Sequence, residues 1–240
     1  MKWLLAVMAA VVLSACGARE VPLGELEPED LWIQGIEEYN QERWAEAIRY
    51  FDRFIMVGGA DARVHQARYY AAEAHFNRRE YVSAASRFSA LAGDLGRATL
   101  ADRSRYMACR SYEEMSPDAP LDQEYTRAAI DHCQSLVDLF PDSEYAEDAA
   151  RIVDELWHRL AEKTYDGGRW YQRRRAYDSA LIYFEDVVRL YPRTSYAPRA
   201  LHRMIEIYEI LEYDTEIEET RARLVREYPD SPEARALARS

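Results

Sequence analysis

The sequence predicts an all-α protein, an α-solenoid of about five consecutive helix pairs. Three observations support this prediction. The 240 residues include only 9 Gly and 9 Pro, and Ala, Glu, Arg and Leu are abundant, which is typical of helices. No run of alternating apolar and polar residues is long enough for a convincing strand. A turn with Pro, followed two residues later by Ser or Thr, recurs along the chain and suits the boundary between helices.

The first segment, residues 1–15, is predicted to be a lipoprotein signal peptide. Lys2 precedes an apolar run, and the run ends in Leu-Ser-Ala-Cys at Cys16. This ending resembles the bacterial lipobox, whose cysteine receives a diacylglycerol thioether and, after cleavage, an N-acyl chain. An ordinary secretory signal with a chance cysteine is the alternative. The apolar run is shorter than the ~20 residues of a spanning helix, so we expect Cys16 to carry the anchor and residues 16–28 to form a tether.

A domain built of repeated helix pairs is expected over residues 29–240. Its second helices repeat a small residue followed four positions later by a larger one, which lets two helices approach and then fills the gap between them. Helix pairs at a period of about 34 residues with Ala, Phe and Pro at these offsets are the tetratricopeptide pattern. The five units are residues 29–62, 65–98, 100–142, 144–194 and 196–231. The repeated positions are Ala47, Phe51 and Phe54, then Ala84, Phe88 and Leu91, then Ala129, Cys133 and Leu136, then Ala180, Phe184 and Val187.

The third and fourth units are longer than the others. Residues 116–121 form an insertion between the two helices of the third unit. In the fourth unit the extra residues are continuously helical in pattern, so we expect one elongated first helix from about residue 144 to about residue 173, on the order of 45 Å long. Gly167 and Gly168 lie inside it and either kink the helix or permit a close crossing. We favour the crossing, because Gly168 holds the small position of its unit.

The residues that carry chemistry in enzymes do not form a recognisable pattern here. The five His are scattered, and the sequence has no paired-His zinc motif, no nucleophile elbow and no phosphate-binding glycine loop. We therefore expect neither an enzyme nor a cofactor or metal. The formal net charge of −12 argues against nucleic acid as a partner. Cys109 and Cys133 are either two buried free thiols, to which we give more weight, or a disulfide in an oxidising compartment.

The inner face of the first two units is predicted to bind peptide. First helices line the inner face of tetratricopeptide arrays, and the two helices carry aromatic residues and Asn at matching offsets. Such a groove suits an extended peptide with apolar or aromatic side chains. The alternative places these aromatic side chains in the core between repeats. The groove residues are Trp32, Ile36, Tyr39 and Asn40 in the first unit, and Tyr69, Phe76 and Asn77, with Glu73 between them, in the second.

A second candidate surface lies at the end of the elongated helix. Arg169, Arg173 and Arg174 accompany Trp170 and Tyr171 in an otherwise acidic chain. Arg, Trp and Tyr are the residue types that dominate interface hot spots. We expect a partner interface at the three arginines. The alternative is that the aromatic side chains are core and the arginines pair with nearby carboxylates.

The lipobox, the five units and the segments at residues 156–165 and 170–177 together resemble the BamD family of outer-membrane assembly lipoproteins. The resemblance implies a lipid-anchored scaffold on the periplasmic face of the outer membrane that helps to insert β-barrel proteins. The implied partners are a barrel-forming BamA-like protein, other lipoproteins of the complex and unfolded outer-membrane precursors. Gly17 after the cysteine, in place of Asp, resembles sorting to the outer membrane.

Two other classes of protein share some of these features. The first is a periplasmic tetratricopeptide adaptor of the Tol–Pal system, which has similar repeat turns but a coiled-coil start and no lipid anchor. In this chain the repeats begin soon after Cys16, with no heptads between. The second is an envelope enzyme with a helical-repeat body, which requires convergent catalytic groups that the sequence does not indicate.

Overall fold

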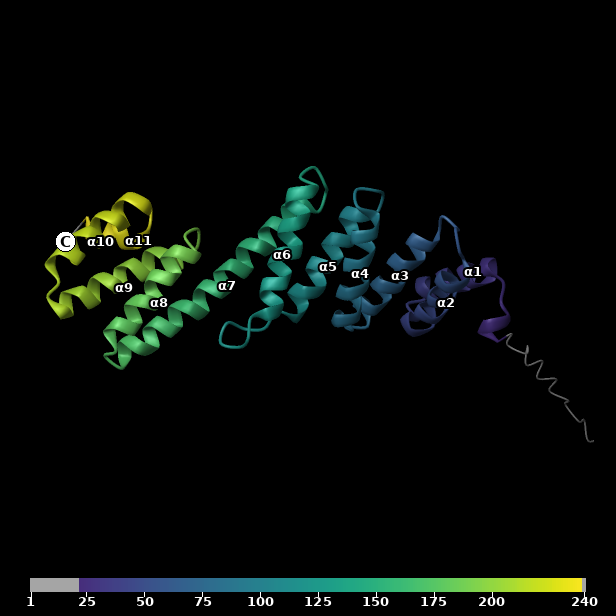
Figure 1. The fold of residues 1–240 in the computed structure, drawn as a ribbon, viewed down its shortest axis with the longest axis horizontal. Helices are drawn as coiled ribbons and strands as arrows, with labels where there is room; N and C mark the ends of the chain where they lie inside the picture. The colour runs from purple at the N-terminus through teal and green to yellow at the C-terminus, as the bar shows by residue number, and fades with distance from the viewer. Residues whose placement is uncertain (1–21, 239–240) are drawn as a thin grey trace, which may run out of the picture.

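The computed structural model describes residues 22–238, and within that range every regular element is helical. Eleven α-helices follow one another along a single long axis (Figure 1). The predicted all-α solenoid is confirmed. Residues 1–15 and Cys16 lie outside the described residues. The helices are α1 (Pro28–Asn40), α2 (Trp44–Val57), α3 (Val64–Asn77), α4 (Tyr81–Leu95), α5 (Ala101–Met115), α6 (Glu124–Leu139), α7 (Ala146–Arg173), α8 (Tyr177–Leu190), α9 (Tyr196–Leu211), α10 (Asp214–Glu227) and α11 (Pro232–Leu237).

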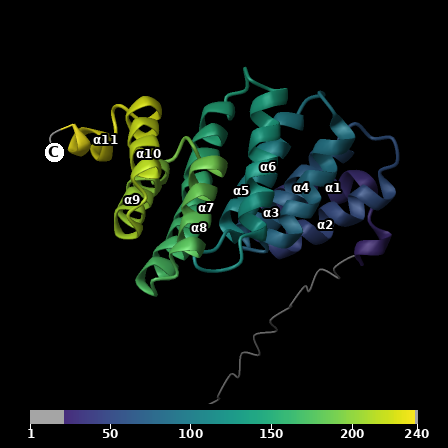
Figure 2. The ribbon, with the colours of Figure 1, turned by 60° about the vertical axis from the view of Figure 1, so that its left-hand side comes forward.

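Each of the five units expected from the sequence holds one pair of helices, from α1 with α2 to α9 with α10, and the pairs stack in chain order (Figure 2). Successive first helices contact each other directly, α1 with α3, α3 with α5, α5 with α7 and α7 with α9. The backbones of successive second helices do not approach each other as closely in the described part of the chain. The array therefore bends toward its first helices, which line the inner face. None of the described helices combines the length and the apolarity needed to cross a membrane.

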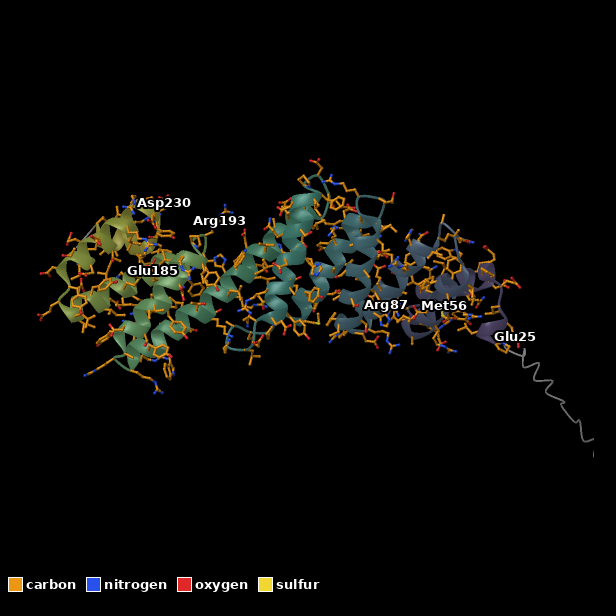
Figure 3. The ribbon with its side chains drawn as sticks, viewed as in Figure 1. Glu25, Met56, Arg87, Glu185, Arg193 and Asp230 are labelled. Atoms are coloured by element: carbon orange, nitrogen blue, oxygen red, sulfur yellow. A yellow bond between two sulfur atoms is a disulfide. The ribbon has the colours of Figure 1, made fainter. Side chains whose placement is uncertain are left out.

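Ion pairs join some of the second helices on the outer face. The guanidinium of Arg87 in α4 donates to the carboxylate of Asp52 in α2 at 2.6 Å. In the same way, Arg223 of α10 donates to Glu185 of α8 at 3.0 Å. Figure 3 labels Arg87 and Glu185, one in each half of the array. No such pair joins α4 to α6 or α6 to α8 in the range 22–238, so the outer face is less closely bridged in the middle of the array.

The repeated positions of the second helices form the core. All twelve residues predicted for the first four units have a relative exposure of 0%. They contribute to four successive apolar clusters rather than to one central core. Each unit therefore buries its apolar face mainly against its neighbours, as expected for a repeat array.

Glycine allows close helix crossings in the first and fourth units. A Cβ atom on Gly35 of α1 would lie 2.8 Å from the ring of Phe51, and one on Gly168 of α7 would lie 2.7 Å from the ring of Phe184. Real Cβ contacts are longer than this, so only Gly fits at these crossings. Because α7 continues through Gly168 to Arg173, the expected close crossing is confirmed.

Helix α7 has 28 residues, which confirms the elongated helix of the fourth unit. Its first half packs with α5 and α6 through Ile152, Leu156 and Leu160. Its second half belongs to a separate cluster, which contains Tyr165 together with residues of α8, α9 and α10. One continuous helix thus packs on the third unit at one end and on the helices of the last two units at the other.

The turns between paired helices contain strained residues that the sequence did not indicate. Glu42, Arg79, Arg175 and Glu212 have φ between 57° and 61°, a left-handed conformation that favours Gly. Each follows a first helix and donates its backbone N–H to a carbonyl three residues earlier. The third unit lacks this turn because its insertion replaces it.

Two expectations need correction. Part of the predicted tether is packed: a 3₁₀ helix forms at Leu23–Glu25, and Leu23 and Leu26 lie against the first apolar cluster. The interpretation of Cys109 and Cys133 as free thiols is wrong, because they form a disulfide between α5 and α6. Cys133 takes the position that Phe holds in the first, second and fourth units. Its Cα lies 4.9 Å from that of Cys109, a separation that the sequence spacing could not reveal.

We predict that Gly168→Ala lowers the midpoint of urea unfolding. Ala gains about 1 kcal/mol of helix propensity, but overpacking against the buried ring of Phe184 costs about 1–3 kcal/mol. Gly93→Ala is the matched control, because Gly93 is also helical and a methyl group added there would have no other atom within 4 Å. The control should raise the midpoint. Equal shifts for both variants would contradict the close crossing.

Candidate functional site

The inner face of the first three units is linked by a polar cluster around Glu73 of α3. The hydroxyl of Tyr39, from α1, donates to one carboxylate oxygen of Glu73. The hydroxyl of Tyr69 donates to the other oxygen at 3.2 Å, and Arg103 of α5 lies 3.4 Å from the same oxygen. The Arg103 guanidinium also lies 4.6 Å from the centre of the Tyr69 ring. One carboxylate therefore ties three successive first helices together.

Tyrosine–acid contacts continue along the inner face. Tyr106 of α5 donates to Asp148 of α7 at 2.6 Å, and its ring stacks on Tyr145 with centroids 4.8 Å apart. Farther along, Arg203 of α9 donates to the hydroxyl of Tyr165 at 3.3 Å and to Glu206 at 2.8 Å. The inner face thus presents phenols, carboxylates and guanidinium groups in alternation, which can bind the backbone and the side chains of an extended peptide.

The phenols at the Glu73 cluster are held in the protonated form. Burial raises the pKa of Tyr39 far above its ordinary value, and the hydrogen bond to Glu73 raises it further. Burial also raises the pKa of Tyr69, with the Glu73 charge as the second cause. Both hydroxyls therefore act as hydrogen-bond donors across the physiological pH range.

The predicted groove residues do not all lie on an accessible surface. Tyr69 is only 1% exposed and packs on Phe88 with ring centroids 5.3 Å apart, so its ring belongs to the core. Placement in the core was the alternative interpretation of the aromatic set, and for Tyr69 it agrees with the structure. The sequence pattern alone could not decide between groove and core for Tyr69.

The other aromatic groove residues are half-buried. Trp32 packs on Phe54 at 5.5 Å, Tyr39 lies 5.2 Å from Trp44, and Phe76 lies 5.3 Å from Tyr81, so each has one covered face. Ile36 packs against the first apolar cluster in the same way, whereas Asn40 and Asn77 are exposed. Arg103 and Tyr106 were not predicted, since the sequence pattern indicated a groove in the first two units alone.

The arginines at the end of α7 are exposed. Arg169 lies 3.3 Å from Asp166, and the Arg174 guanidinium lies 3.9 Å from the centre of the Trp170 ring. The side chain of Arg173 has no ion pair or hydrogen bond to any residue in the range 22–238. Trp170 is 43% exposed and meets Tyr171 edge-on at 4.8 Å. These side chains form an accessible basic and aromatic surface, while Tyr171 is partly covered by the C-terminal cluster.

No group of His, Cys, Asp and Glu side chains in the described part of the chain has the arrangement of a metal site. The fold and the two surfaces define a helical-repeat protein of the tetratricopeptide type, with a polar and aromatic inner face and a basic patch at the end of its longest helix.

A sequence profile of the family described as outer membrane lipoprotein matches residues 25–224. The chain belongs to this family, which includes the BamD proteins.

Curated relatives agree with this placement. The chain is 27% identical over 228 residues to "Outer membrane protein assembly factor BamD" of Caulobacter vibrioides, which covers 92% of the chain and 74% of that protein. It is 29% identical over 126 residues to the protein of the same name from Rickettsia prowazekii, covering 52% of the chain and 50% of that protein. The match to the Vibrio cholerae protein of that name is 34% identical over 100 residues and covers 42% of each chain.

The raised phenol pKa values predict a loss of stability in alkali. Above about pH 10, the unfolded chain releases tyrosine protons that the folded chain still holds, so the free energy of unfolding falls as pH rises. The slope reaches about 1.4 kcal/mol per pH unit for each retained proton. In urea titrations between pH 9 and 12, Tyr39→Phe with Tyr69→Phe should flatten this fall, and Tyr125→Phe, at an exposed site, should leave it unchanged. An unaltered slope in the double variant would contradict the assignment.

Proposed function

We propose that this chain is an outer-membrane protein assembly factor that acts as a non-enzymatic scaffold. The observation that carries the proposal is the family match over nearly all of the helical array, together with relatives named for that role. The physical form of the molecule supports it as well. An elongated array of helix pairs exposes a long inner face, which can hold an extended chain without enclosing it.

The proposal includes a lipid anchor at Cys16 and a position on the periplasmic face of the outer membrane. The lipobox-like sequence before Cys16 and the outer membrane lipoprotein family support this location. The first described residues pack onto the first helix pair, where Arg53 of α2 donates to the carbonyl of Gly24 at 3.2 Å. The array would therefore begin only a few residues from the membrane.

The inner face of the first units is proposed to bind nascent outer-membrane proteins. Half-buried aromatic side chains at Trp32, Tyr39 and Phe76 offer an apolar edge, and the exposed amides of Asn40 and Asn77 can pair with the backbone of an extended peptide. Barrel precursors commonly end in an aromatic residue, which matches this lining. The buried Tyr69 supports the site by fixing Glu73 rather than by direct contact.

A barrel-forming BamA-like protein is proposed to dock at Arg169, Arg173 and Arg174, and other lipoproteins of the complex join the same assembly. Exposure of the arginines and of Trp170 supports the docking site, because Arg and Trp dominate interface hot spots. The patch is also basic within a chain of net charge −12, so it suits an acidic surface on the partner.

We predict that Cys16→Ala abolishes membrane attachment. The anchor chemistry needs the cysteine thiol, and two or more acyl chains are needed for stable binding to a bilayer. Intact-mass measurement of the purified variant should find no acyl mass, and the protein should move to the soluble fraction. A variant that stays in the membrane fraction with an unchanged mass shift would show that the anchor lies elsewhere.

We predict that Arg173→Glu with Arg174→Glu reduces recovery of the barrel partner from detergent-solubilised outer membranes. Two reversed charges at an interface rim should cost about 1–2 kcal/mol, or roughly tenfold in Kd. Arg193→Glu with Arg235→Glu reverses two exposed arginines elsewhere and is the control.

In the same experiment, Tyr39→Ala with Phe76→Ala should lose precursor proteins and keep the barrel partner. Helicity by circular dichroism should stay parental in all three variants.

The first part of this proposal fails if the Arg173 and Arg174 variant retains the partner through washing at high salt. The second part fails if the Tyr39 and Phe76 variant recovers the same precursors as the parent chain.

A further inference from the structure

A groove of about 500 Å³ lies along α7, at the place where the packing changes from α6 to α8. We call it the α7 groove. Its floor is one stripe of α7, spaced three or four residues apart, and its walls are the loop between α5 and α6 on one side and α8 on the other. The floor residues include Leu160, Lys163, Thr164, Gly167, Trp170 and Tyr171.

The elongation of α7 produces this groove. Helix α6 packs on the first half of α7, up to Leu160, and α8 packs on the second half, from Tyr165, so the packing partner of α7 changes along this stretch. The loop at residues 116–123 reaches this stretch, as seen beside the middle of α7 in Figure 1. Arg159 donates to the carbonyl of Ser116 at 3.1 Å, and Lys163 donates to the carbonyl of Leu121. The loop is fixed to α7, so the groove is preformed.

The groove has an aromatic lining made possible by a glycine. A Cβ on Gly167 would lie 2.8 Å from the ring of Tyr183 of α8, so the absence of a side chain lets this ring lie against α7. Tyr183 is 5.3 Å from Tyr171, which meets Trp170 edge-on. Tyr183 is 37% exposed, and Trp170 43%. Three rings thus offer an accessible surface for another aromatic side chain.

Positive charge surrounds the lining. Arg127 of α6 and Lys163 line the groove, and the Arg174 guanidinium covers one face of the Trp170 ring. The side chain of Arg127, like that of Arg173, has no ion pair or hydrogen bond within residues 22–238. The only carboxylate among the lining residues is Asp166, and it lies 3.3 Å from Arg169. In a chain of net charge −12, this is a local excess of unpaired cations.

We propose that the α7 groove binds an extended segment of a partner protein in which an aromatic side chain is flanked by carboxylates. The aromatic side chain would stack among Trp170, Tyr171 and Tyr183, and the flanking carboxylates would pair with Arg127 and Lys163. A basic segment would be repelled, and a purely apolar one would leave the cations unpaired. The inference rests on the proposed function, because it specifies which kind of partner segment binds beside the docking surface proposed at the end of α7.

The test is a calorimetric titration of the full chain in detergent with the blocked peptide acetyl-GDEFEDG-amide at low ionic strength. Trp170→Ala should weaken binding about tenfold or more, because it removes the exposed ring of the lining. Trp157→Ala is the matched control: Trp157 is also on α7, is 37% exposed and lines a different hollow, between α6 and the turn after α8. The control should bind as the parent does.

Charge is tested separately. Arg127→Glu should weaken binding about threefold to fivefold, and Arg235→Glu, at an exposed site on α11, should not. The peptide acetyl-GNQFQNG-amide, without carboxylates, and the peptide acetyl-GDEAEDG-amide, without the ring, should both bind more weakly than the first.

Three results would overturn the proposal: equal affinities for the Trp170 and Trp157 variants, equal affinities for the acidic and neutral peptides, or tighter binding of the basic peptide acetyl-GKKFKKG-amide. The first would place the peptide elsewhere, the second would indicate an apolar occupant, and the third an acidic site. These titrations contain no assembly protein. A failure of the proposed function would be read instead from the absence of a barrel partner in material recovered from outer membranes with the parent chain.

Discussion

The contact between a small residue on one helix and a large side chain on its partner sets the geometry of the whole array. Where Gly168 meets Phe184, and where Gly35 meets Phe51, the ring fills the space that a Cβ would need. This contact fixes how closely paired helices approach, and the approach of successive pairs brings the first helices together on one face. The Glu73 cluster depends on that convergence, because a single carboxylate can reach α1 and α5 only if both lie beside α3.

The third unit meets the same constraint by a different chemistry. Its second helix has Cys133 where the first, second and fourth units have Phe, and a thiol alone leaves most of the volume of a ring unfilled. The disulfide to Cys109 draws α5 and α6 together at this level. A covalent link in the unfolded chain also reduces the conformational entropy that folding must overcome. The stability of the central unit is thus tied to an oxidising compartment, which agrees with export from the cytoplasm.

Much of the fold could be predicted because it depends on local periodicity. The buried ladder from Ala47 to Val187, the length of α7 and the crossing at Gly168 all follow from residues a few positions apart. The remaining features depend on residues that are distant in sequence. The burial of Tyr69, the disulfide and the α7 groove each require the relative placement of two helices to within a few ångströms. The left-handed turns at Arg79 and Glu212 were missed for another reason, since neither position carries the Gly that usually marks such a turn.

The continuity of α7 joins neighbouring units of the array through one uninterrupted helix. A single helix of 28 residues packs on α5 and α6 at one end and on α8 and α9 at the other, so no loop separates the third unit from the surface at Arg173. Hydrogen bonds run along the whole backbone of a helix, and a long helix curves only gently unless a specific feature kinks it. The spacing between the third unit and the surface at Arg173 is therefore set by the length of one helix.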